Sequence, residues 1–396
     1  MNPDHRIASP MTEAPVVPIG PRIAALRAIT LVAATFLAFA IAGCGARNPP
    51  HLPSAVNPMP VPPVATVPSA PLPPSSAAQL SAIPAPFAIA RGTDGNLWFT
   101  EFRSHRIGRM TTQGDSKPYE LDTDVLPERL VAGPDTAIWF TDPAGNRIGR
   151  LDPGGAQAYV PLRTANSGPA EITRGPDGNL WFTEHAANRI GRITPLGTLT
   201  EFVLPHVGGP AGIATGADGN LYVAENSGDR IDRMSPQGHV DEFRLPSVGS
   251  LPNGIVAGPD GNVWFTELGS HKLGRLSPAG DLTEYPLPAI GTPLSITAGP
   301  DRALWVTEPQ AHAVFKVSSD GHALIFYLPQ TVVPSFIADG PDGNLWFTEP
   351  TGKIGRLTPV GILTEFPVAA YSASVSDVPS VAAAGAPRKD LLLSKP

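Results

Sequence analysis

The stretch that decides the fold is Gly340 to Arg356, which reads GPDGNLWFTEPTGKIGR, and Gly175 to Arg192 reads almost identically as GPDGNLWFTEHAANRIGR. The pattern occurs seven times between residues 86 and 368, and its aromatic anchor recurs every 41 or 42 residues. The anchors are Trp98, Trp139, Trp181, Tyr222, Trp264, Trp305 and Trp346. All six tryptophans of the chain occupy this one repeated slot, so we interpret them as parts of a scaffold.

A period near 41 residues with short tryptophan-bearing strands is typical of a β-propeller, in which each repeat is one small sheet whose faces are covered by its neighbours. We therefore expect an all-β fold, a seven-bladed β-propeller of four-stranded antiparallel blades, over residues 84–370. The length of 396 residues alone would suggest two or more domains. The repeat overrides that count and predicts one domain.

Turn chemistry places the strands within each repeat. GPDGN predicts a tight turn, because Asp-Gly tolerates the positive φ angles that hairpins need. NLWFTE follows as the second strand and NRIGRIT as the third. An outer strand is expected around one aromatic residue of each repeat, namely Tyr119, Tyr159, Phe202, Phe243, Tyr285, Tyr327 and Phe366.

Charged residues that recur in every repeat are predicted to serve the fold. One acidic slot holds Glu101, Asp142, Glu184, Glu225, Glu267, Glu308 and Glu349, and one basic slot holds Arg109, Arg150, Arg192, Arg233, Arg275, Lys316 and Arg356. We expect these two sets to pair with each other or with turn backbone as ion pairs around the ring. A third slot alternates His105, His271 and His312 with Asn146, Asn188 and Asp229, which indicates turn-forming residues.

The N-terminal region predicts export. Residues 1–43 contain an apolar stretch from Ala28 to Ala42 after Arg22 and Arg27, which is the length of a signal-peptide core. The stretch ends in Ile41-Ala42-Gly43-Cys44, which resembles a bacterial lipobox, and Cys44 is the single cysteine of the chain. We expect a lipidated Cys44 that anchors the protein to a membrane in the bacterial cell envelope, at the outer membrane or periplasmic face in a two-membrane organism. An uncleaved N-terminal anchor is the alternative.

The flanking segments are predicted to build no core. Residues 44–83 form a proline-rich linker, typical of a semi-rigid spacer, and residues 371–396 read as a disordered tail. The net charge of -7 is mild, and no lysine or arginine run occurs, so nucleic-acid binding has no electrostatic support. We expect a monomer.

The repeated words LWFTE, NRIGRIT and LTEFPLP resemble the streptogramin B lyases, also called virginiamycin B lyases, over all seven repeats. The resemblance implies a seven-bladed propeller and a metal-assisted elimination that opens a cyclic depsipeptide antibiotic. In that family the catalytic groups lie at the starts of the innermost strands. They comprise a Pro-His pair in each of the last two blades, a glutamate before the last pair, and another glutamate after the last tryptophan strand.

This chain departs from that pattern at every catalytic position. Leu294 stands where the substrate-contacting histidine belongs, Val333 replaces the metal-binding glutamate, Ser335 replaces the base, and Pro350 fills the late carboxylate slot beside Glu349. No proline at the start of an inner strand is followed by histidine. The residues that follow these prolines are Phe87, Glu128, Ala170, Ala211, Asn253, Leu294 and Ser335.

We therefore predict no catalytic or metal-binding residue of the family type, and no cofactor unless magnesium serves a lyase with displaced groups. Charged and aromatic departures from the repeat suggest a polar binding site for a small molecule, peptide or protein at the rim of the channel. The candidates are Phe87, Glu128, Arg129, Glu171, His185, His206, Asn253 and Ser335. Solvated loop residues are the alternative for this set. The expected function is a non-catalytic, ligand-binding envelope lipoprotein, with a displaced-site lyase or a purely structural scaffold as alternatives.

Overall fold

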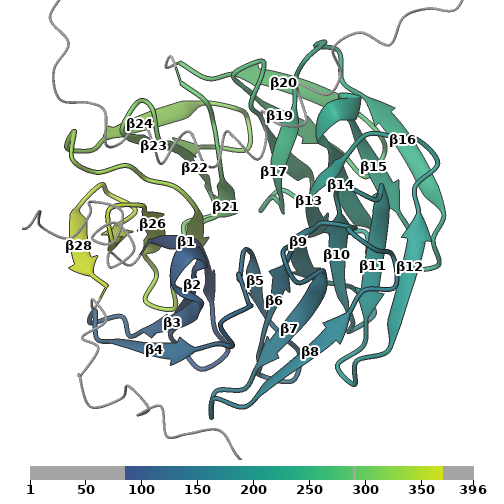
Figure 1. The fold of residues 1–396 in the computed structure, drawn as a ribbon. Coiled ribbons are helices and arrows are strands. Elements are labelled where there is room, and N and C mark those ends of the chain that lie inside the picture. The colour runs from purple at the N-terminus through teal and green to yellow at the C-terminus, as the bar shows by residue number, and fades with distance from the viewer. Residues whose placement is uncertain (1–84, 289–290, 369–396) are drawn as a thin grey trace, which may run out of the picture. The chain divides into compact units, whose positions relative to one another are not determined.

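A computed structural model describes residues 85–288 and 291–368, which form seven four-stranded antiparallel sheets arranged in a ring (Figure 1). Each sheet is one uninterrupted run of chain, and its strands are hydrogen-bonded in sequence order. The sequence prediction of a seven-bladed β-propeller is confirmed. The predicted signal peptide, Cys44, the predicted linker up to residue 83 and the predicted tail from residue 371 lie outside the described residues.

The first four blades consist of the following strands: β1 (Pro86–Arg91), β2 (Leu97–Glu101), β3 (Arg106–Met110) and β4 (Ser116–Glu120); β5 (Leu130–Ala132), β6 (Ile138–Asp142), β7 (Arg147–Leu151) and β8 (Gln157–Pro161); β9 (Pro169–Arg174), β10 (Leu180–Glu184), β11 (Arg189–Ile193) and β12 (Leu199–Val203); β13 (Pro210–Thr215), β14 (Leu221–Glu225), β15 (Arg230–Met234) and β16 (Val240–Arg244).

The last three blades consist of β17 (Pro252–Ala257), β18 (Val263–Glu267), β19 (Lys272–Leu276) and β20 (Leu282–Pro286); β21 (Ile296–Ala298), β22 (Leu304–Glu308), β23 (Ala313–Val317) and β24 (Ala323–Tyr327); β25 (Ile337–Asp339), β26 (Leu345–Glu349), β27 (Lys353–Leu357) and β28 (Leu363–Pro367). Two short 3-10 turns, Phe102–Ser104 and Asn226–Gly228, follow β2 and β14. Within the described ranges, no helix has the length and apolar character that crossing a bilayer requires.

The repeated aspartate of GPDGN organises one end of every inner hairpin. In the first blade, Asp94 accepts a hydrogen bond from the indole of Trp98 at 3.1 Å and one from the guanidinium of Arg109 at 2.7 Å. These bonds hold the pKa of the Asp94 carboxyl below its usual value, although burial opposes them. The residue after Asp94 is Gly95, whose φ of +75° is a conformation that glycine adopts without strain. Thr136 and Arg302 adopt a positive φ at the same position of the second and sixth blades.

The predicted pairing between the repeated acids and bases is wrong, because the two sets lie at opposite ends of the blades. Glu101 pairs in register with Arg106, whereas Arg109 lies opposite Trp98. Five of the bases pair with the turn aspartate instead, in Arg109–Asp94, Arg150–Asp135, Arg192–Asp177, Lys316–Asp301 and Arg356–Asp342. The expected bond to turn backbone is confirmed for Arg192, Arg233, Arg275 and Arg356, each of which donates to a carbonyl of the next blade.

The seven acids are nearly inaccessible to solvent, with exposed fractions of 0 to 1%. Asp142 pairs with Arg147 at 2.7 Å. Glu308 has no such partner, because Ala313 occupies the position across the hairpin. Neither of its carboxylate oxygens receives a hydrogen bond from residues 85–288 or 291–368. Burial is the one cause that raises the pKa of Glu308, to about 7.

The core consists of seven clusters between adjacent blades, and each cluster centres on a buried anchor of the repeat. The outer-strand aromatic usually lies over that anchor, as Phe366 does over Trp346 at 5.3 Å between ring centroids. All seven aromatics used to predict the outer strands lie in those strands, but in two blades the packing position is held by the neighbouring residue. Phe326, not Tyr327, stacks on Trp305, and Val160, not Tyr159, pairs with Ile148.

Glycine in NRIGR makes room for the phenylalanine of LWFTE. A Cβ at Gly355 would lie 2.2 Å from the ring of Phe347, and the same close approach recurs in four other blades. The fourth blade reverses the sizes, with Val223 opposite Asp232. The combined volume of the two side chains that face each other here is therefore similar from blade to blade, as close packing requires.

Among the described residues, the ring closes by packing of the first blade on the seventh, without exchange of a strand between them. Ile89 and Phe99 share a buried cluster with Ala338 and Trp346. The hydroxyl of Thr348 donates to the Phe87 carbonyl at 2.7 Å across this seam. Thr100, Thr141, Thr183 and Thr307 make the equivalent bond to the following blade at 2.6 to 2.9 Å.

The His/Asn/Asp slot is confirmed as a turn position. His105, Asn146, Asn188, Asp229, His271 and His312 all adopt positive φ angles between 47 and 56°. Their side chains bond the connection to the next blade, as His105 does through Nδ1 to the Val125 carbonyl at 2.7 Å. These histidines therefore support the loops and do not face the channel.

Candidate functional site

We call the end of the ring at which the inner strands begin the mouth face. Pro86, Pro169, Pro210 and Pro252 each pair with the acid that ends the second strand of their blade, so the buried acids lie at the same face. The chain enters the propeller at this face and leaves it there, since Pro367 pairs with Lys353 next to the seventh acid.

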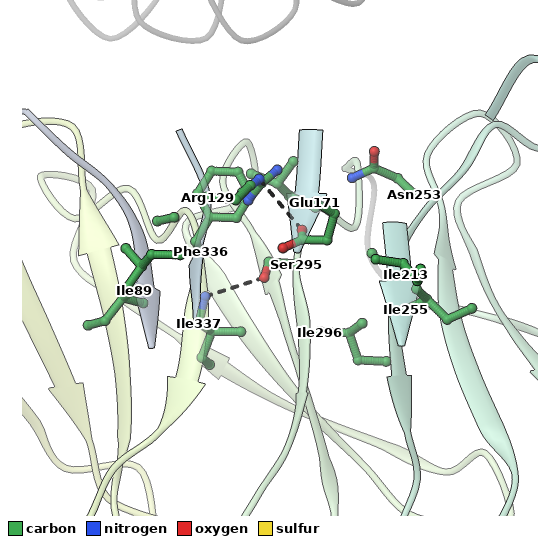
Figure 2. A pocket seen from close by; sticks show the side chains of 14 residues that line it. Ile89, Arg129, Glu171, Ile213, Asn253, Ile255, Ser295, Ile296, Phe336 and Ile337 are labelled. Atoms are coloured by element: carbon green, nitrogen blue, oxygen red, sulfur yellow. Dashed lines mark hydrogen bonds and ion pairs between the residues drawn. The ribbon is translucent and has the colours of Figure 1, made fainter. Parts of the chain in front are cut away.

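A cavity of about 150 Å³ opens on the axis of the ring and is lined by residues at the start of all seven blades (Figure 2). Its apolar lining is a collar of β-branched and aliphatic side chains, namely Ile89, Leu130, Ile213, Ile255, Ile296 and Ile337. Its polar lining is Arg129, Glu171, Asn253 and Ser295. A cavity of this volume can hold a benzene-sized group.

Arg129 is held against aromatic rings at one wall of this cavity. Its guanidinium carbon lies 3.7 Å from the ring centroid of Phe336 and 5.3 Å from that of Phe87. The two rings are themselves in contact, with centroids 4.8 Å apart. An arginine over two aromatic faces gains cation–π attraction and loses little freedom when it binds a ligand.

Glu171 faces Arg129 from the next blade. Its Oε2 lies 3.6 Å from Nε of Arg129, which is an ion pair longer than a hydrogen bond (Figure 2). Glu128 lies beside them, and burial raises the pKa of its carboxyl against the opposing charge of Arg129, with a further increase from Glu171. The group therefore combines one permanent cation, one carboxylate and one carboxyl that tends to keep its proton.

Of the eight predicted rim residues, three line the cavity: Arg129, Glu171 and Asn253. The ring of Phe87 contacts the guanidinium of Arg129, and Glu128 precedes Arg129 in the chain. Ser335 is 9% exposed and contributes through its backbone, since its carbonyl accepts from Thr307 and its amide donates to Thr348.

The two predicted histidines lie elsewhere. Nδ1 of His185 lies 3.1 Å from the Pro210 carbonyl, and burial lowers the pKa of this histidine. His206 pairs with Glu242 at 2.8 Å on the outer part of the fourth blade. Neither lines the cavity, so the structure does not join them to Arg129.

Sequence reasoning missed Phe336 and Ser295. Most of the polar and aromatic lining comes from the second residue after each rim proline, and of that row only Arg129 and Glu171 were among the predicted residues. This second row contains Ala88, Arg129, Glu171, Gly212, Gly254, Ser295 and Phe336. The twofold alternation of a strand was the signal that could have identified it.

The positions that should hold magnesium do not fit a metal ion. Magnesium requires oxygen ligands, above all carboxylates. The corresponding residues here are Val333 and Pro350, and the nearest carboxylate in the cavity, Glu171, is paired with Arg129. No three His, Cys, Asp or Glu side chains are grouped as metal ligands in residues 85–288 and 291–368.

Comparison with known proteins supports the resemblance seen in the repeat. The sequence model of the virginiamycin B lyase family matches residues 78–291 and 206–386. The chain belongs to this family. A solved streptogramin B lyase is 33% identical, covers 72% of this chain and 94% of its own, and superimposes with a TM-score of 0.67.

Two further relatives in the family have solved structures. Virginiamycin B lyase from Staphylococcus aureus is 34% identical over 69% of this chain and 94% of its own, with a TM-score of 0.66. A catalytically inactive variant of that enzyme was solved with quinupristin, and matches with a TM-score of 0.65 over the same shares of the two chains. Hydrazine synthase from Kuenenia stuttgartiensis, 15% identical with a TM-score of 0.58, shares the fold alone. The comparison with curated proteins gave no match.

Proposed function

We propose that this member of the virginiamycin B lyase family is a non-catalytic envelope lipoprotein that binds a ligand at the mouth of its propeller. The observation that carries this proposal is the makeup of the cavity wall. Where the family pattern requires histidines and glutamates, this chain has Leu294, Val333 and Ser335. In their place, the wall carries a guanidinium fixed on two aromatic rings.

Elimination requires a group near neutral pKa that takes up a proton beside the reacting carbon. Leu294 and Ser335 cannot supply one, and His185 is engaged with the Pro210 carbonyl outside the cavity. The apolar collar and the fixed Arg129 are features of a binding site, because such sites combine an apolar lining with a few placed polar groups.

The decisive experiment is incubation of the purified propeller with magnesium and quinupristin. We expect no linearised product by mass spectrometry under conditions in which the Staphylococcus aureus enzyme linearises the antibiotic completely. A metal-dependent lyase with displaced catalytic groups is the second candidate, favoured by membership of the family. Formation of product by this chain would establish that candidate and overturn the non-catalytic assignment.

The cell-envelope location belongs to the same proposal. The lipobox-like run before Cys44 supports a lipid anchor, and residue 85 leaves the ring at the mouth face. A spacer upstream would therefore connect the anchor to the face that carries the cavity. Expression of the full chain and of Cys44→Ser should give a membrane-bound protein and a protein released from membranes, respectively. Equal membrane retention of both would refute lipidation at Cys44.

A further inference from the structure

The guanidinium of Arg129 is partly buried and donates no hydrogen bond to any residue in the described part of the chain. Its side chain is 17% exposed, and its nearest acceptor, Glu171, is 3.6 Å away. Phe336 and Phe87 fix its position through their ring faces, which accept no conventional hydrogen bond. The guanidinium presents N–H donors only, so these groups are open to an acceptor that enters the cavity. The five N–H groups of Arg129 therefore form a prepared site for an acceptor.

Other donors of the cavity are also uncommitted. The hydroxyl of Ser295 accepts a hydrogen bond from the Ile337 amide at 3.3 Å, so its own hydrogen is free to donate (Figure 2). The side-chain amide of Asn253 makes no hydrogen bond to the described residues and lines the cavity. Donors thus outnumber acceptors around the opening.

The remaining lining is apolar. Ile213, Ile255 and Ile296 lie below Asn253 in Figure 2 and offer an apolar surface to an aliphatic or aromatic body. The faces of Phe87 and Phe336 are not available to a ligand cation, since Arg129 already lies over both. A ligand ammonium would also meet the guanidinium as a like charge.

We propose that the channel mouth binds small carboxylates with an apolar body, with the carboxylate held by the fork of Arg129 and the body against the isoleucine collar. The inference rests on the proposed binding function and names its ligand class. Guanidinium and carboxylate match in planar, two-bond geometry, which is why arginine is preferred for this recognition. Asn253 and Ser295 supply donors to the oxygen atoms that the fork leaves free.

The test uses three probes of one shape that differ in charge: phenylacetate, phenylacetamide and phenethylamine. Calorimetric titration of the propeller should show binding of phenylacetate at least tenfold tighter than that of phenylacetamide, and no binding of phenethylamine. Arg129→Gln should lose the phenylacetate signal. Arg163→Gln removes the same charge from an exposed position of the mouth face and should bind as the unmodified protein does.

Arg129→Lys keeps the positive charge but not the planar guanidinium, and should weaken the binding of phenylacetate at least tenfold. This second variant keeps the test valid if the glutamine variant does not fold. Equal affinity for acid and amide, or binding that survives loss of Arg129, would overturn the proposal. Preference for phenethylamine would show that Glu128 and Glu171 define a cation site instead. Absence of binding by all three probes would reject the carboxylate class, whereas the lyase assay with quinupristin tests the non-catalytic function separately.

Discussion

The unpaired acid of the sixth blade offers a direct test of how burial acts in this ring. Glu308 is 0% exposed, its carboxylate oxygens receive no hydrogen bond from the part of the chain that the structure describes, and burial raises its pKa from 4.5 to about 7. A rise of this size corresponds to a free-energy penalty of about 3 kcal/mol on the charged form, at about 1.4 kcal/mol for each tenfold change in proton affinity.

The sign follows from proton uptake. Because the folded pKa lies above the unfolded one, Glu308 binds a proton on folding, and its penalty is absent below about pH 4.5. The penalty grows as the pH rises and is complete above about pH 7. Glu308→Gln removes the titration, so the variant should gain about 3 kcal/mol on the unmodified protein between pH 4.5 and pH 8.

Urea unfolding of both proteins across this pH range measures the effect, and the difference between them cancels all other titrating groups. Asp142→Asn is the matched control, because Asp142 fills the same slot but pairs with Arg147 at 2.7 Å. That variant should be destabilised at pH 8 by about 1.5 to 3 kcal/mol, since Arg147 loses this charged acceptor and keeps only its ion pair with Asp124 at 3.0 Å. A difference between Glu308→Gln and the unmodified protein that does not change with pH would refute the reasoning.

Three further predictions concern packing and closure, and thermal or urea unfolding checks each of them. Thr348→Val removes the hydrogen bond to the Phe87 carbonyl and the acceptor of the Phe336 amide, and should lower the free energy of unfolding by about 1 to 3 kcal/mol. An unchanged free energy of unfolding would show that the closure seam does not depend on this hydroxyl. Gly355→Ala places a methyl group against Phe347 and should cost about 1 to 3 kcal/mol, and adding Phe347→Val should cost less than the sum of the single changes; strict additivity would contradict direct contact. Asp177→Ala leaves the indole N–H of Trp181 without its acceptor and should cost about 1 to 3 kcal/mol, whereas a neutral result would mean that water replaces the carboxylate.

The blades could be predicted from the sequence because every repeat contains the same type of turn, an aromatic anchor at the same position and strands of similar length. The predicted ion pairs were wrong because the repeated acid and the repeated base were expected to pair with each other. Counting across the hairpin corrects this, since Glu101 lies opposite Arg106 and Trp98 lies opposite Arg109. Arg109 therefore lies next to the turn that precedes the second strand, where it donates a hydrogen bond to Asp94.

The candidate site was predicted in part because departures from a repeat are visible in one sequence. Arg129, Glu171 and Asn253 stood out by charge or polarity and do line the cavity. Phe336 did not, because an aromatic residue at the start of a strand resembles core. Its role depends on its contact with Arg129, which starts a blade on the other side of the closure seam, and only the three-dimensional ring brings the two together.

The way the ring closes has a consequence for chain order. Every sheet is contiguous, and Val368 at the end of the last blade packs in the same cluster as Ile89 of the first. The closure seam therefore differs from the other six blade boundaries mainly in lacking a covalent link. A circular permutant that joins residues 368 and 86 by a short linker and opens at another boundary would leave all seven sheets intact. The first blade is therefore distinguished only by its place in the sequence, because each of the seven described sheets is built in the same way.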